Sequence, residues 1–472
     1  METYQIYAGG KFVSSSQVIL VSNPFTGKAF AQTFLADKTI LEEAICKAED
    51  AKPLMKAMPS YQRYAILMEI ALEMKKDEVR LAEVLAQEAC KPYKYALGEI
   101  GRAIQTFIVA AEESKRLPSE YISLDWTPAG AGKEGIVKYF PVGLVAGIAP
   151  FNFPINLAVH KIAPAIAAGC PIILKPASST PLSTLELAKI IDRTSLPKGA
   201  VSILPMDRIT GNLLVTDNRF KLLTFTGSPE IGWKMKEDAG KKKVVLELGG
   251  NAGVIVTKSS NIDIAVAKCV VGGFAYSGQV CIHAQRIYID KDIFNEFSEK
   301  FVNAVKHLKV GDPLNADTDI SSMIDEANAI RVEEWINKAV KDGAKVLCGG
   351  NRKDAFVEPT VLTNTNNDMN VCVKEVFGPV VILESYNDFK EAVDLINDSV
   401  YGLQAGVFTN HADEIDLAFN ELEVGGVVIN DVPTFRVDHM PYGGIKDSGL
   451  GREGIKYAIM DMMEAKILIK SK

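Results

Sequence analysis

The sequence has neither a long run of hydrophobic residues nor a long block of basic ones. Its longest basic block is Lys241 to Lys243, and 59 acidic residues against 52 basic ones give a net charge of −7. Gly, Pro or charged residues break the apolar runs before they reach the roughly 20 positions that a membrane span requires. We therefore expect no nucleic acid and no membrane among its partners.

Cysteine and histidine are scarce, and their spacing fits neither disulfides nor a metal site. Seven cysteines and 5 histidines are scattered over 472 residues, with no Cys-x-x-Cys pair. An odd, dispersed set of thiols is typical of a reducing compartment. The N-terminus also lacks the basic region and apolar run of a signal peptide. We expect a cytoplasmic protein with free thiols and no required metal.

The hydrophobic pattern predicts an α/β fold with more than one core. The chain is long, and 47% of its residues are hydrophobic, which is enough for two or three domains. Residues 38–116 show apolar positions at three- and four-residue spacing, which indicates helices. Beyond Gly143, apolar and amphipathic segments alternate, which indicates parallel βαβ units. The expected strands are 144–148, 171–174, 201–204, 222–226 and 244–248, followed by a second series near Val254, at 286–289, near Val346, at 380–383 and at 427–429.

Two β-like segments interrupt this pattern, and a third lies at the end of the chain. Residues 121–126 and 135–140 flank the turn-rich segment 127–132, which predicts a hairpin. Residues 466–470 form an apolar strand that needs a partner. We expect the hairpin and this strand to form an oligomerisation arm. The alternative is that the strand closes the sheet of its own domain.

Three polar residues stand out as chemical candidates. Cys281 follows the segment 276–280, in which small residues and Gly end a helix pattern and let a substrate reach the sulfur, although a lone cysteine is usually a core residue. Glu247 ends a strand, where α/β active sites gather, but alone it fits a surface residue equally well. Asn152 lies among prolines and aromatics at a helix start, where its amide suits an oxyanion. Together they suit aldehyde oxidation, with a nicotinamide as hydride acceptor.

The order of several motifs along nearly the whole chain resembles the aldehyde dehydrogenase superfamily. The resemblance implies two Rossmann-type α/β domains with a β oligomerisation arm, assembled as a homodimer or homotetramer. Residues 1–118 and 140–247 would bind the dinucleotide, 248–450 would form the catalytic domain, and 119–139 with 451–472 the arm. The motifs are residues 150–154, 174–176, 225–228, 246–250, 278–281, 375–379 and 441–444.

The resemblance also implies catalytic roles. Cys281 would be the nucleophile, Asn152 and the Cys281 backbone amide the oxyanion hole, and Glu247 the base that activates water to hydrolyse the thioester. Relatives that transfer the acyl group to coenzyme A typically lack that carboxylate, so hydrolysis to the free acid is expected. The alternatives are a coenzyme A-acylating dehydrogenase, or a non-catalytic protein that keeps the fold for binding or assembly. A cysteine hydrolase fits less well because no histidine is placed to pair with the cysteine.

The implied cofactor is NAD or NADP, although the usual Gly-x-Gly-x-x-Gly fingerprint is absent. Lys175 would approach the adenosine ribose, Ser228 the pyrophosphate and Glu375 the nicotinamide ribose. Many NAD-preferring relatives carry Glu where this chain has Ser178, so NADP should be tolerated. The full implied set is Ile148, Phe151, Lys175, Ser178, Ser228, Leu248, Glu375 and Phe377.

The substrate is expected to be a small polar or anionic aldehyde. Helical spacing from Asn152 places His160 on nearly the same face. Relatives that oxidise long apolar aldehydes tend to have aromatics in the substrate sleeve, whereas this chain offers His160, Arg102 on the preceding helical stretch and Arg436 in a late loop. These positions resemble a branch that acts on lactaldehyde, phosphonoacetaldehyde or semialdehydes, so the three side chains would anchor a hydroxyl or anionic group. The alternatives are a core histidine satisfied by hydrogen bonds and two arginines in surface salt bridges.

Overall fold

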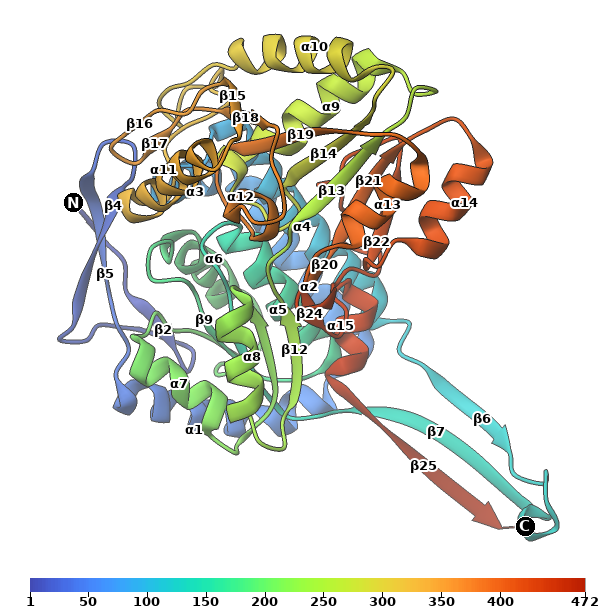
Figure 1. The fold of residues 1–472 in the computed structure, drawn as a ribbon. Coiled ribbons are helices and arrows are strands. Elements are labelled where there is room, and N and C mark those ends of the chain that lie inside the picture. Colours follow the sequence, from blue (N-terminus) through green and yellow to red (C-terminus); the bar gives the residue numbers. More distant parts are fainter. Residues whose placement is uncertain (472) are drawn as a thin grey trace.

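The computed structural model describes residues 1–471, which form a two-sheet body with a projecting arm (Figure 1). Lys472, the last residue of the predicted arm segment, lies outside the described residues. The N-terminal segment, for which no elements were predicted, folds into short strands, several of them too short for a two-residue alternation to be recognised. These strands are β1 (Glu2–Thr3), β2 (Ile6–Ala8), β3 (Lys11–Val13), β4 (Val18–Asn23) and β5 (Lys28–Phe34).

The helical prediction for residues 38–116 is confirmed. Asp37 starts the first helix, where its side chain accepts a hydrogen bond from the Ile40 amide. Prolines precede two of the later helices, and buried residues such as Leu67 and Phe107 join one large core. The helices are α1 (Lys38–Ala57), α2 (Ser60–Lys76), α3 (Glu78–Ala89) and α4 (Tyr93–Ser114).

The first predicted strand series forms an eight-stranded sheet of order β24-β12-β11-β8-β9-β10-β2-β3. Its five central strands are parallel, as expected, and antiparallel strands close both edges. The central strands are β8 (Leu144–Ile148), β9 (Ile172–Lys175), β10 (Val201–Ile203), β11 (Phe220–Thr226) and β12 (Lys243–Glu247), with β24 (Gly449–Leu450) at one edge. The connecting helices are α5 (Pro154–Ala168), α6 (Leu182–Arg193), α7 (Arg208–Thr216) and α8 (Pro229–Asp238).

The second series forms a seven-stranded sheet of order β15-β18-β19-β14-β13-β21-β22, which confirms a second α/β unit. Two of its strands, β18 and β21, were not predicted. Gln404 and Gly406 break the apolar pattern of β21, although the whole strand is buried. The strands are β13 (Ala252–Val256), β14 (Ala284–Asp290), β15 (Lys345–Cys348), β18 (Thr360–Thr363), β19 (Val380–Tyr386), β21 (Gln404–Phe408) and β22 (Gly426–Ile429).

Helices and short β pairs complete this second unit. The helices are α9 (Ile262–Phe274), α10 (Phe294–Lys306), α11 (Glu326–Lys341), α12 (Asn370–Val373), α13 (Phe389–Asn397) and α14 (Ala412–Glu421). The short pairs are β16 (Arg352–Lys353) with β17 (Phe356–Val357), and β20 (Tyr401–Gly402) with β23 (Ile445–Lys446). No helix within residues 1–471 is long and apolar enough to cross a membrane.

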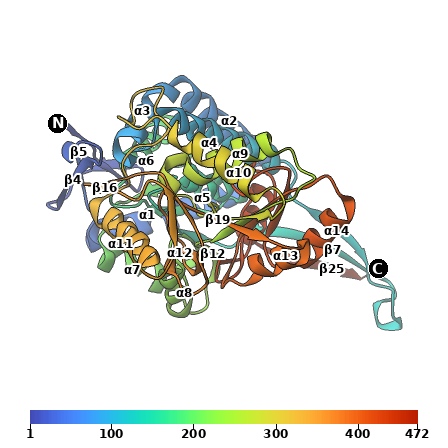
Figure 2. The same cartoon turned by 45° about the horizontal axis from the view of Figure 1, so that its top comes forward.

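The predicted hairpin and terminal strand form one three-stranded sheet that projects from the body (Figure 2). The terminal strand pairs antiparallel with the hairpin from Met463 opposite Pro141 to Ser471 opposite Lys133, so it joins neither domain sheet. Ile467, Leu468 and Ile469 are 45%, 54% and 53% exposed, which leaves apolar surface on the projecting sheet. The strands are β6 (Ser119–Ser123), β7 (Lys133–Pro141) and β25 (Met463–Ser471).

The domain boundaries remain a prediction. The edge strand β24, from the end of segment 248–450, pairs with β12 of the first sheet. Helix α15 (Ile455–Asp461), from the predicted arm segment, buries Ile455 and Ile459 in the core that α4 and α5 share. The C-terminal part of the chain therefore returns to the first sheet before it enters the arm.

Candidate active site

The carboxyl ends of the central strands of the first sheet lie at one edge. The strand register puts Ile148 beside Lys175, and Thr226 beside Glu247. Because parallel strands all end on the same side, the loops that follow them meet at this edge. The motifs that begin at these strand ends are therefore neighbours in space.

Asn152 lies in the loop between β8 and α5 and is held at both ends of its amide. Its Nδ2 donates to the Gln279 carbonyl oxygen at 3.0 Å, and its Oδ1 accepts from the Phe153 amide at 3.1 Å. The buried Lys91 ammonium donates to the Asn152 carbonyl oxygen at 2.6 Å and also pairs with Glu99. The second N–H of the side-chain amide is the one left for a ligand.

Cys281 follows the turn η2 (Ala275–Gly278), whose backbone is unusual. Tyr276 and Ser277 have φ of 51° and 54°, in the sparsely populated left-handed region. A Cβ on Gly278 would lie 2.1 Å from the Gly378 carbonyl oxygen, so glycine is required there. The Cys281 sulfur lies 3.3 Å from the Tyr442 hydroxyl oxygen. Burial raises the pKa of Cys281 to about 11, against the lowering effect of the Tyr442 hydrogen bond.

Glu247 ends β12 with a carboxyl group that is buried and unpartnered. Neither of its side-chain oxygens has a hydrogen-bond partner among residues 1–471. Burial raises its pKa well above the ordinary range, and the neighbouring Glu453 carboxylate raises it further. The positive charges of Arg436 and Lys161 act in the opposite direction. The group therefore holds its proton at a pH where an exposed glutamate has lost it.

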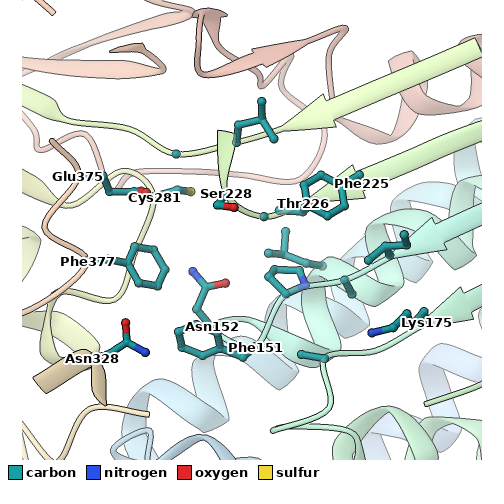
Figure 3. A pocket seen from close by; sticks show the side chains of 18 of the residues that line it. Phe151, Asn152, Lys175, Phe225, Thr226, Ser228, Cys281, Asn328, Glu375 and Phe377 are labelled. Atoms are coloured by element: carbon teal, nitrogen blue, oxygen red, sulfur yellow. The ribbon is translucent and has the colours of Figure 1, made fainter. Parts of the chain in front are cut away.

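Cys281 and Asn152 line one end of a cavity of about 480 Å³ (Figure 3). Glu375 and Phe377 lie at the same end in this view, and Lys175 lies at the opposite end. Seven of the eight predicted cofactor residues line the cavity: Ile148, Phe151, Lys175, Ser228, Leu248, Glu375 and Phe377. Asn328 and Arg331 of α11 also line it and were missed, because no motif marks that helix.

The cavity has features that suit a dinucleotide. A Cβ on Gly249 would lie 2.4 Å from Glu375 Oε2, so only glycine keeps the backbone this close to the carboxylate. The other oxygen of Glu375 accepts from the Gly250 amide at 3.0 Å, and burial raises the pKa of Glu375 to about 7. Mostly apolar walls with a few placed polar groups are typical of cofactor sites.

Ser178, the eighth predicted residue, lines a neighbouring cavity of about 420 Å³ that shares Ile148, Lys175 and Phe225 with the first. Arg208, at the start of α7, and Lys234 line the same cavity. Sequence reasoning missed both cations because each lies in an ordinary helix, with no motif around it. Asp238 also lines this cavity and pairs with Lys234 at 3.0 Å, so Lys175 and Arg208 leave the cavity cationic.

The structure brings Arg102, His160 and Arg436 together in a polar network that lies outside the lining of the first cavity and is buried except at Arg102. Asp438 Oδ1 accepts from Arg102 and also bonds His160 Nε2, both at 2.8 Å. Arg436 pairs with Glu453 at 2.8 Å. Burial, reinforced by the positive charge of Arg436, lowers the pKa of His160, so the imidazole is neutral.

Sequence reasoning placed only part of this network. Asp438 lies in the loop that contains Arg436, but no role was assigned to it. Glu453 and Lys161 had no signal at all, and their side chains pair at 3.3 Å. Lys161 also donates to the Thr226 hydroxyl at 2.7 Å, at the end of β11. The network therefore reaches the strand edge where Glu247 lies.

Comparison with known proteins gives a family match over nearly the whole chain. The model of the aldehyde dehydrogenase family matches residues 12–468. The 3-sulfolactaldehyde dehydrogenase of Priestia megaterium is 41% identical over 99% of this chain and 98% of its own. The lactaldehyde dehydrogenase of Methanococcus aeolicus is 42% identical over 98% of this chain and 99% of its own.

Solved structures of related proteins also match nearly the whole chain. Aldehyde dehydrogenase 21 from Physcomitrella patens, in complex with the reaction product succinate, has a TM-score of 0.98 and 47% identity, covering 100% of this chain and 98% of its own. The glyceraldehyde-3-phosphate dehydrogenase GapN from Methanocaldococcus jannaschii, complexed with NADP, has a TM-score of 0.92 and 40% identity, covering 96% and 99%. The expected fold and enzyme class are confirmed. The chain belongs to the aldehyde dehydrogenase family and is an NAD(P)-dependent oxidoreductase.

Proposed function

We propose that this protein oxidises a small polar or anionic aldehyde to its carboxylic acid with NAD or NADP, through a thioester on Cys281. The observation that carries the proposal is the meeting of three groups. Cys281 and Asn152 line one end of the cofactor-sized cavity. Glu247 lies beside the segment of Tyr442, whose hydroxyl is 3.3 Å from the sulfur, because a Cβ on the adjacent Gly443 would lie 2.9 Å from Glu247 Oε1.

The first half of the reaction uses Cys281 and Asn152. The thiolate attacks the aldehyde carbon, and the carbonyl oxygen gains negative charge. The remaining N–H of the Asn152 amide and the Cys281 backbone amide stabilise that charge. A nicotinamide bound in the cavity would supply the hydride acceptor, and loss of hydride from the attacked carbon would leave a thioester on Cys281.

The second half uses Glu247. As a carboxylate it takes a proton from the water that attacks the thioester, and Cys281 leaves with the electrons of the C–S bond. Its two unpartnered oxygens are free to hold that water. A buried base with a raised pKa is better matched to neutral pH than an exposed glutamate.

The polar network supports a polar or anionic substrate. The network contains three cations, Lys161, Arg102 and Arg436, and two carboxylates, Asp438 and Glu453. The partners of these two carboxylates lower their pKa values. The Nε atoms of both arginines and Nδ1 of His160 are buried without partners among residues 1–471. The two arginine Nε–H groups are donors that suit a hydroxyl or an anionic group. In the neutral His160, Nε2–H donates to the Asp438 carboxylate, so Nδ1 is an acceptor that suits a hydroxyl. The sulfolactaldehyde and lactaldehyde names of the relatives, and the succinate bound to one of them, agree with this chemistry.

The neighbouring cavity supports binding of both NAD and NADP. Ser178 leaves room for a 2′-phosphate where a glutamate would repel it, and Arg208 supplies positive charge, whereas Lys234 is paired with Asp238 of the same cavity. Solved relatives hold either cofactor: GapN from Methanocaldococcus jannaschii is complexed with NADP, and betaine aldehyde dehydrogenase from Staphylococcus aureus with NAD+.

We also propose a cytoplasmic homodimer or homotetramer held together by the arm. The apolar side chains of Ile467 to Ile469 are half exposed on the projecting sheet, where a second copy of the chain would cover them. All seven cysteines are free thiols, which suits a reducing compartment.

The first prediction concerns the reaction and its base. Purified protein with a panel of short aldehydes and NAD or NADP should raise absorbance at 340 nm without coenzyme A. Because the pKa of Glu247 is raised, its carboxylate fraction should grow with rising pH, and the hydrolysis rate with it. Glu247→Gln should lose roughly 10²–10⁴-fold in turnover but keep a single-turnover burst. Cofactor reduction only in the presence of coenzyme A would contradict the proposal.

The second prediction concerns cofactor choice. The catalytic efficiencies with NAD and NADP should agree within about tenfold, or ~1.4 kcal/mol. Arg208→Ala should weaken NADPH binding, measured by fluorescence titration, about tenfold and leave NADH binding unchanged. A thousandfold preference for NAD in the wild type would show that the cationic cavity does not receive a 2′-phosphate.

The third prediction concerns the substrate anchor. Arg436→Ala should raise the Michaelis constant for the best short acidic aldehyde at least tenfold, with less effect on a neutral aldehyde of the same length. Arg116, an exposed arginine paired with Glu113, supplies the control variant Arg116→Ala. An unchanged Michaelis constant for the acidic aldehyde in Arg436→Ala would remove Arg436 from the anchor.

The fourth prediction concerns the arm. Light scattering should give the mass of two or four chains. Replacing Leu468 and Ile469, which are 54% and 53% exposed, with lysine should shift the protein toward smaller species, because the buried interface would then contain charges. A wild-type mass equal to one chain would rule out the oligomer.

A further inference from the structure

Tyr442 is held firmly beside the reacting sulfur, although the proposed mechanism gives it no role. It belongs to the segment 441–444, one of the motifs that the sequence analysis singled out, and it is only 3% exposed. Its backbone amide donates to the Glu453 carbonyl oxygen at 2.9 Å, and the Glu453 amide donates back to its carbonyl oxygen. The next residue, Gly443, has φ of 156°, and a Cβ there would lie 2.9 Å from Glu247 Oε1. The segment therefore packs directly against the site.

The Tyr442 hydroxyl meets one group, the sulfur of Cys281. The distance between oxygen and sulfur is 3.3 Å, and the sulfur is the only hydrogen-bond partner of this hydroxyl among residues 1–471. Burial raises the pKa of Tyr442 well above its ordinary value. The phenol therefore keeps its proton over the whole range in which a thiol ionises. Once the sulfur is a thiolate, only the hydroxyl has a proton to donate.

The guanidinium of Arg436 lies against the face of the Tyr442 ring. The guanidinium carbon of Arg436 is 3.7 Å from the centre of the Tyr442 ring, and its ion pair with Glu453 fixes it there. A positive charge against an aromatic face draws electron density from the ring, which makes the phenol a stronger donor. A chain of contacts thus runs from Glu453 through Arg436 and Tyr442 to the sulfur of Cys281.

We propose that Tyr442 is a positioning residue whose hydroxyl, backed by the Arg436 cation, donates a hydrogen bond to the Cys281 thiolate and so stabilises and aims the nucleophile. The proposal rests on the proposed role of Cys281. It adds a group that no part of the thioester scheme contains, and it explains why a tyrosine with an otherwise unpartnered hydroxyl lies in an apolar cluster with Val280, Ile282 and Leu403.

Other groups near the sulfur raise the pKa of Cys281, and a hydrogen-bond donor acts against them. Burial raises the pKa of Cys281 to about 11, and the carboxyl groups of Glu375 and Glu247 also act to raise it. The Tyr442 hydrogen bond and the more distant Arg436 charge act to lower it. Both of these groups favour the thiolate against the effect of burial.

The test is the pH dependence of alkylation at Cys281 in the full-length protein. Iodoacetamide labelling is followed by mass spectrometry of the peptide that contains Cys281, because Cys46 is exposed and will also react. Tyr442→Phe keeps the ring and removes only the hydroxyl. It should raise the apparent pKa of Cys281 by about one unit, so that alkylation below that pKa is roughly tenfold slower. A loss of packing alone would not produce such a shift.

Two further variants make the result specific. Tyr386 is also buried, and its hydroxyl donates to the Val256 carbonyl oxygen, so Tyr386→Phe removes a comparable hydroxyl elsewhere and should leave the Cys281 titration unchanged. Arg436→Gln keeps the Tyr442 hydroxyl but removes the cation, and it should raise the Cys281 pKa by a smaller amount. This variant also provides the test if Tyr442→Phe does not fold.

The outcomes separate this inference from the proposed function. A Cys281 titration in Tyr442→Phe that superimposes on the wild type, or shifts to lower pH, overturns the role of Tyr442. If Tyr442→Phe does not fold, an Arg436→Gln titration without an upward shift overturns it instead. Retention of aldehyde oxidation by Cys281→Ser overturns the thioester scheme, whatever the titration shows.

Discussion

Burial of titratable groups is the constraint on which the site depends. Glu247 is buried and Cys281 is partly buried, and in each case burial is the largest influence on the pKa. Burial favours the protonated forms, whereas the proposed chemistry needs a thiolate first and a carboxylate later. The neighbouring charges decide how far each group can ionise. Arg436 faces both groups and favours the charged form of each.

The fold keeps these groups in place through contacts that cross from one element to another. Glu99 of α4 accepts hydrogen bonds from the amides of Ile155 and Asn156 in the first turn of α5, where unpaired amides favour a carboxylate. The same Glu99 pairs with Lys91, which holds the carbonyl of Asn152. The helical layer thus fixes Asn152, the proposed oxyanion donor, at the edge of the first sheet.

Much of this arrangement could be predicted from the sequence. The alternation of short apolar strands with helices predicted both sheets, because buried parallel strands appear in a sequence as nearly continuous hydrophobic runs. The motif around Cys281 and the strand-end position of Glu247 marked the proposed reacting groups. The network around Asp438, Glu453 and Lys161 could not be predicted in the same way. Its members lie far apart in the chain, and each alone looks like an ordinary charged residue. Only the tertiary fold brings them together.

The antiparallel edges and the N-terminal strands were missed for a related reason. Strands such as β24, with two residues, have no periodicity of their own, and they form because an edge of the first sheet offers free hydrogen-bonding groups. Arg208 and Lys234 likewise carry no local signal, since their meeting with Ser178 depends on how the helices between the strands pack.

The most direct test of the thioester is to trap it. In Glu247→Gln, the aldehyde and cofactor should form an acyl adduct that persists because its hydrolysis is slow, and mass spectrometry of the digested protein should locate the added acyl mass on the Cys281 peptide. If the cofactor is reduced at full stoichiometry while no adduct forms, or if the adduct lies on another residue, the account of Cys281 as the acyl carrier is wrong.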